Sequence, residues 1–188
     1  MSRRDDIHRQ GIRLPATRSA AEAAEHVRSA LEHGARNVQY EFTDPDDDWT
    51  PIWLIVTPDG SGTIITGNLH KHDMARRVGA LARRFGAVAL GHLHSSWMVS
   101  VEDVSDERMK IIGSGRVAVS DQPERREIIL LAVYTAGTAK QLVAPIIRHV
   151  DRPPELGPFE SPLPDIPDDV TYSGAMVDPL QEALVKVG

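Results

Sequence analysis

The 188-residue sequence contains no cysteine, which excludes a disulfide framework, a thiolate metal site and a cysteine nucleophile. Aromatic residues are scarce, and no apolar run approaches the roughly 18 residues that a membrane-spanning helix needs. The first ten residues lack the apolar stretch of a secretory signal. Because 41% of the residues are hydrophobic and 26% are charged, the composition predicts a globular cytoplasmic protein with no membrane partner.

Negative charge is concentrated at the C-terminal end of the chain. Residues 151–188 carry eight acidic and two basic side chains, which account for the whole formal net charge of −6. Residues 1–150 are therefore neutral overall. A neutral body with an acidic tail lacks the clustered positive field that phosphate backbones require, and this argues against nucleic-acid binding. A weaker hypothesis places such binding in the arginine-rich residues 1–18.

The periodic segments divide the chain into three parts. Residues 1–18 are polar without periodicity and predict an N-terminal arm. Residues 19–150 predict an α+β domain of order α-β-β-β-α-β-β-β. Hairpins outnumber helices, which favours two layers, with a mainly antiparallel or mixed sheet and two helices on one face. The predicted helices are 19–34 and 74–85, and the predicted strands are 37–43, 52–57, 63–66, 87–101, 126–134 and 140–150.

Apolar positions within the central strands predict the buried core of this domain. The expected core residues are Ile52, Leu54, Val56, Val88, Leu90, Ile129, Leu131 and Val133. Residues 102–124 are polar and contain two glycines, so we expect a loop between two strands there. Pro145 lies within the last strand and favours a sheet edge or a bulge.

Residues 151–188 contain seven of the 13 prolines and predict an extended, acidic C-terminal arm. Asp178 and Pro179 have the pattern of a helix start, so a short helix is expected at the end of the arm. Apolar side chains recur every few residues along the arm. They are expected to anchor it on a protein surface, and a neighbouring subunit is favoured over the chain's own body. These partner-binding candidates are Leu156, Phe159, Leu163, Ile166, Tyr172, Leu180 and Leu184.

Two histidines lie close together in the predicted strand that follows the second helix. His92 and His94 point to the same face of such a strand and can hold one metal ion. Ser100 and Asp103 follow them, and Glu41 precedes them on a predicted strand. This order resembles the JAMM (Mov34) family of zinc-dependent hydrolases. The resemblance implies that His92, His94 and Asp103 hold Zn²⁺, that Glu41 activates a water molecule, and that Ser100 stabilises the reaction intermediate.

A second resemblance covers about residues 74–150. Trp97-Met-Val, a polar excursion and then Pro123-Glu-Arg-Arg before an apolar strand are similar to a family of uncharacterised bacterial and phage proteins. Together with the charged arm and the lack of a complete catalytic set, this favours a non-catalytic structural or accessory protein of a phage-type or bacterial assembly. It would need no cofactor, would dock its arm on another protein subunit, and would reside in the cytoplasm or in a virion. The alternative is a zinc-dependent hydrolase.

Overall fold

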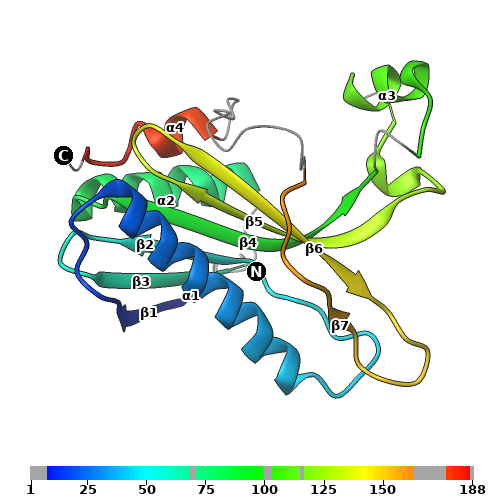
Figure 1. Cartoon of the computed structure of the whole chain (residues 1–188), viewed down its shortest axis with the longest axis horizontal. Helices are drawn as coiled ribbons and strands as arrows, with labels where there is room; N and C mark the ends of the chain where they lie inside the picture. Colours follow the sequence, from blue (N-terminus) through cyan, green and yellow to red (C-terminus); the bar gives the residue numbers. More distant parts are fainter. Residues whose placement is uncertain (1–7, 68–70, 100–102, 115–116, 163–176, 187–188) are drawn as a thin grey trace, which may run out of the picture.

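The computed structural model describes residues 8–67, 71–99, 103–114, 117–162 and 177–186. Within this part of the chain, a seven-stranded antiparallel sheet has the order β1-β3-β2-β4-β5-β6-β7 (Figure 1). The strands are β1 His8–Arg13, β2 Ile52–Val56, β3 Ser61–Thr66, β4 Ala89–Met98, β5 Arg126–Tyr134, β6 Ala139–Ile147 and β7 Glu155–Leu156. The helices are α1 Ala20–Glu41, α2 Lys71–Phe85, α3 Asp106–Gly113 and α4 Val177–Gln181, with a 3₁₀ turn at Val119–Asp121. The predicted α+β class is confirmed.

The helices cover both faces of the sheet. On β2, Leu54 and Val56 pack in a core beneath α1, whereas Trp53 and Ile55 pack in a second core beneath α2 and α4. Figure 1 shows α1 crossing one side of the sheet, with α2 on the other. The predicted arrangement of two helices on one face is therefore wrong. The central strands read as continuous apolar runs because they are buried on both faces.

Helix α1 is longer than predicted. It begins at the expected place, where the Ser19 hydroxyl accepts a hydrogen bond from the Glu22 amide at 3.2 Å. Gly34 does not adopt a positive φ and does not end the helix, which continues to Glu41. The strand predicted at residues 37–43 is therefore wrong. Leu31 and Ala35 continue the buried stripe of the helix, whereas Tyr40 is 82% exposed.

Two other segments also contain structure that the sequence analysis did not predict. Residues 8–13, expected in a polar arm, form the edge strand β1 and pair with β3. Ile12 packs against the α1-side core, and the absence of a side chain at Gly62 makes room for it, because a Cβ there would lie 2.6 Å from Ile12 Cγ1. The predicted loop at residues 102–124 contains α3, which Ser105 caps.

The predicted core is confirmed at seven of its eight positions, all of them 5% exposed or less, while Ile52 is partly buried. Leu131 illustrates the consequence, because it is fully buried in the middle of β5. None of the helices in the described part of the chain has the length and apolar content to cross a bilayer.

We expect Leu131→Ala to lower the free energy of unfolding by about 2–5 kcal/mol, because it leaves a cavity between β5 and α1. Urea denaturation measures this change. Ile147→Ala is the matched control, since Ile147 is 46% exposed on β6 and should cost less than about 1 kcal/mol. A loss below about 1 kcal/mol for Leu131→Ala would contradict the placement of β5.

Candidate functional site

Three rings gather around His92 on the α2 side of the sheet, and together with it they form a ring cluster. The His92 ring centroid lies 4.6 Å from Trp53 on β2, 5.1 Å from His94 on β4 and 5.7 Å from Tyr134 on β5. The His94 and Tyr134 rings are within 18° of parallel to it. Strand register explains the grouping. Trp53 is the direct neighbour of His92, and on β5 the small Ala132 lies opposite it, which leaves room for the Tyr134 ring.

Two rings of this cluster, His92 and Tyr134, carry buried polar atoms that have no partner among the described residues. His92 is 2% exposed and Tyr134 is fully buried. Neither ring nitrogen of His92, nor the Tyr134 hydroxyl, makes a hydrogen bond within the part of the chain that the structure describes. Each unpaired buried polar group lowers the free energy of unfolding by about 1–3 kcal/mol. Native structures therefore contain few such groups.

Burial also sets the protonation of these groups. Desolvation, with a smaller effect of the neighbouring His94 charge, lowers the pKa of His92 to about 3. Desolvation raises the pKa of Tyr134. At neutral pH the cluster therefore contains an uncharged imidazole and an uncharged phenol. Neither group offers a charge to a reacting molecule, and neither is accessible to one from the solvent.

Among the described residues of the hydrolase hypothesis, only His92 and His94 are brought together. His92 and His94 share the α2 face, as their spacing predicted, but Glu41 ends α1 on the opposite side of the sheet. The prediction of Glu41 on a strand is wrong. The Asp103 carboxylate accepts a hydrogen bond from Arg126 at 2.7 Å, and Ser100 lies outside the described residues.

Two imidazoles fall short of the three protein ligands that a catalytic zinc ion requires. Within the described ranges, no group of three or more histidine or acidic side chains is placed to hold a metal ion. The residues that the structure describes therefore do not fit the zinc centre that the JAMM resemblance implies.

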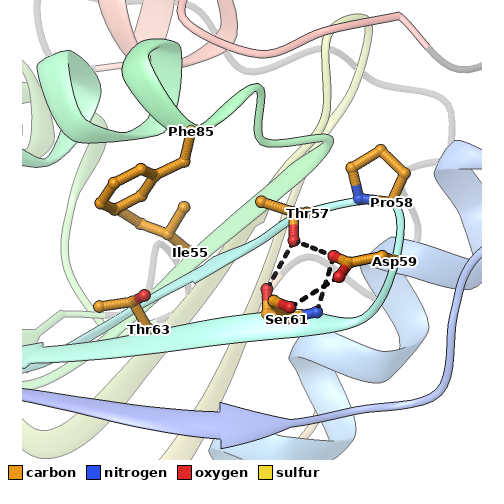
Figure 2. A pocket seen from close by; sticks show the side chains of 7 residues that line it. All are labelled: Ile55, Thr57, Pro58, Asp59, Ser61, Thr63 and Phe85. Carbon is orange, nitrogen blue, oxygen red and sulfur yellow. Dashed lines mark hydrogen bonds between the residues drawn. The ribbon is translucent and has the colours of Figure 1, made fainter.

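A shallow pocket of about 590 Å³ lies beside the turn between β2 and β3. Figure 2 shows Thr57, Asp59 and Ser61 turned toward one another there. The Asp59 carboxylate accepts hydrogen bonds from the Thr57 hydroxyl at 2.6 Å and from the Ser61 hydroxyl at 2.8 Å. These bonds, that of Thr57 first, hold the pKa of Asp59 well below its usual range. The carboxylate is already engaged in stabilising the turn, so this pocket offers no free catalytic group.

The most elaborate site is a groove between α1 and β6, which we call the arm groove. It holds residues 155–160, the arm strand. Arg36 donates hydrogen bonds to the carbonyls of Leu156 and Gly157, and the Gln39 side chain accepts one from the Leu156 amide at 3.1 Å. The Arg36 guanidinium also lies over the Phe159 ring, 5.9 Å from its centroid. One helix face therefore contacts successive backbone groups of an extended segment.

Strand β6 forms the other wall of the arm groove. Ile146 pairs with Leu156, and the Gly157 amide donates to the Pro145 carbonyl at 2.9 Å. Val143 and Glu160 exchange two backbone hydrogen bonds of 2.9 Å. Gly157 is required at its position, because a Cβ there would lie 2.5 Å from Pro145 Cγ.

The predicted partner-binding residues of the arm pack on the chain's own body where the structure describes them. Leu156 is buried in the core beneath α1, and Phe159 packs against that core. Leu180 and Leu184 are buried in the core beneath α2. Leu163, Ile166 and Tyr172 lie outside the described residues. Sequence reasoning missed Arg36 and Gln39, because neither belongs to a motif. Arg36 directly precedes the segment that was predicted as a strand, and Gln39 lies within that segment.

Comparison with known proteins adds no relative. No protein-family model, curated protein or solved structure matches this chain. The candidate sites are therefore interpreted from their own geometry, and the arm groove has more specific contacts than either the ring cluster or the pocket.

The burial of His92 predicts a pH-dependent stability. An unfolded chain binds a proton at His92 near pH 6.5, whereas the folded protein binds it only near pH 3. Stability that is present above pH 6.5 should therefore be lost as the pH falls toward 3, by up to about 1.4 kcal/mol per pH unit. Urea denaturation of wild type and His92→Phe between pH 7 and pH 5 measures this slope.

We expect a flatter slope for His92→Phe, which keeps an aromatic ring but cannot be protonated. His33→Asn is the matched control, because His33 is an exposed histidine on α1, and it should keep the wild-type slope. Equal slopes for wild type and His92→Phe would contradict the buried, uncharged state of His92.

Proposed function

We propose that this chain is a non-catalytic structural or accessory subunit of a phage-type or bacterial assembly, and that it docks its C-terminal arm on a neighbouring copy. The observation that supports this proposal is the arm groove. Its two walls hold the backbone of the arm strand through hydrogen bonds with the side chains of Arg36 and Gln39 and with the backbone of β6. Grooves that add a strand to a sheet edge in this way are a common mode of protein recognition.

The groove is selective for the chain's own arm strand. It buries the Leu156 side chain, excludes a side chain at Gly157 and places an aromatic ring, Phe159, under Arg36. A second copy of the chain supplies an identical segment. Contacts made within one chain can therefore be made between two chains without any change of sequence, which is the basis of segment exchange.

The connection between β6 and the arm strand favours such exchange. Residues 148–154 link them and, fully extended, span about 23 Å. Val150 is 98% exposed, and Pro153 and Pro154 reduce the conformational freedom that is lost when the linker extends. The Arg152–Glu155 ion pair, 2.9 Å long, is solvent-exposed and contributes little to holding the linker closed.

No contact among the described residues favours the zinc hydrolase over this proposal. His92 and Tyr134 are closed to solvent, and Glu41 lies on the other side of the sheet from His92. In the arm groove, by contrast, all of the contacts described above between the arm strand, α1 and β6 are formed.

A cysteine pair tests the exchange directly, since the chain has no cysteine of its own. Ile147 and Glu155 are paired neighbours across β6 and β7, at a spacing that a disulfide can bridge. We expect Ile147→Cys/Glu155→Cys, oxidised at the concentration where sedimentation shows the most dimer, to run as a covalent dimer on a non-reducing denaturing gel.

The controls are the two single-cysteine variants, which should not give this dimer at a comparable yield. Deletion of residues 151–188 should also lower the oligomeric mass. Disulfides that form only within single chains, or a wild-type protein that stays monomeric at every concentration, would overturn arm exchange.

A further inference from the structure

A projecting module lies at the far end of the β4–β5 hairpin. We call its described residues, 103–114 and 117–125, the head. The β4–β5 ladder extends to the pair Met98 and Arg126, and Figure 1 shows α3 standing away from the body beyond it. None of the head's described residues belongs to either apolar core. The head therefore contributes little to the packing of the body, and long excursions of this kind usually carry function.

Polar contacts hold the head together. Arg108 donates to the Gln122 side chain at 2.8 Å and to the Glu124 carboxylate at 3.1 Å. The Gln122 side chain donates to the Ala118 carbonyl at 3.1 Å. At the base of the head, Arg126 binds Asp103. This network gives α3 a defined position. One side of the helix faces the rest of the head, and the other side faces solvent.

Large apolar side chains are exposed on and beside the head. Trp97 is 41% exposed, and Ile111 and Val117 are each 38% exposed. The Arg125 guanidinium lies over the Trp97 ring, 5.0 Å from its centroid. Three of the eight large apolar side chains exposed in the described residues therefore lie in this small part of the chain. Apolar surface on a projecting module is typical of a contact with another protein.

The exposed face of α3 is self-complementary in charge. Asp106, Glu107, Lys110 and Ile111 are all exposed, and their spacing places them on one stripe of the helix. The acids lie in the first turn and the lysine in the last. None of the three charged residues makes an ion pair within the described part of the chain. Two such helices laid antiparallel bring each lysine beside the acids of the other and place Ile111 between them.

We propose that two copies of this chain associate head to head through antiparallel α3 helices. The contact is isologous, because each copy presents the same stripe to the other. Antiparallel packing also sets the helix dipoles in their favourable orientation. This proposal rests on the proposed function in one respect, because both take the neighbouring subunit to be another copy of this chain. It adds a second interface, separate from the arm groove, so that pairs formed by arm exchange can be linked into a longer assembly.

A charge exchange tests the head contact without interference from the arm. The background is Ile147→Cys/Glu155→Cys, closed within single chains by oxidation at low concentration and isolated as monomer, so that arms cannot exchange. In this background Lys110→Glu makes the stripe wholly acidic, and Asp106→Lys/Glu107→Lys makes it wholly basic. We expect the unmodified stripe to dimerise and each charge variant alone to dimerise about tenfold more weakly.

An equimolar mixture of the two charge variants should recover dimer, because every charged contact in the mixed pair is then favourable. Ile111→Ser added to both variants is the control, and it should abolish the recovery if the contact is specific rather than a general attraction of opposite charges. Sedimentation velocity measures all of these masses. A locked, unmodified chain that stays monomeric, or a mixture that recovers nothing, would overturn the head contact. Either outcome leaves the covalent arm dimer unaffected, so the two proposals fail separately.

Discussion

The close contact between α1 and β4 at Gly91 is the constraint on which the rest of the structure depends. A Cβ at this position would lie 2.5 Å from Val27 Cγ1 and 2.6 Å from Leu31 Cδ1. Only glycine lets the helix lie this near the strand. Because α1 is one continuous helix, the contact at Gly91 also fixes the direction of its last turns, where Arg36 and Gln39 bind the arm strand. The arm groove thus depends on packing in the middle of the sheet.

Successive side chains of β4 point to opposite faces of the sheet, and the face that lies toward α2 carries histidines. His92 follows Gly91 in the chain and points away from α1, into the core beneath α2. The spacing of His92 and His94 predicted that they share a face, but not what surrounds them. Trp53 and Tyr134 come from other strands, and their contact with His92 follows from strand register, which alternating apolar residues do not specify when both faces are buried.

The class of the fold and most of its core could be predicted, because continuous apolar runs and helical stripes are local signals. The extent of α1 could not. Val38, Tyr40 and Phe42 alternate like a strand, and Gly34 looks like a helix stop, yet packing of Ala35 on the sheet overrides both signals. Strand β1 was missed for the opposite reason. Only Ile12 in it faces the core, so it has no period to detect.

Strand β1, at one edge of the sheet, and strand β6, which pairs with the short edge strand β7, are protected from wrong pairing by different means. Strand β1 carries Arg9 and Arg13, and charged side chains on an edge discourage pairing with other strands. Strand β6 has Pro145, which offers a carbonyl but no amide, and the Gly157 amide meets that carbonyl. Pro145 therefore makes β6 a poor partner for an arbitrary strand and a good one for the arm strand. This complementarity is the same whether the arm strand belongs to one chain or to its neighbour, so the choice between the two falls to the linker at residues 148–154.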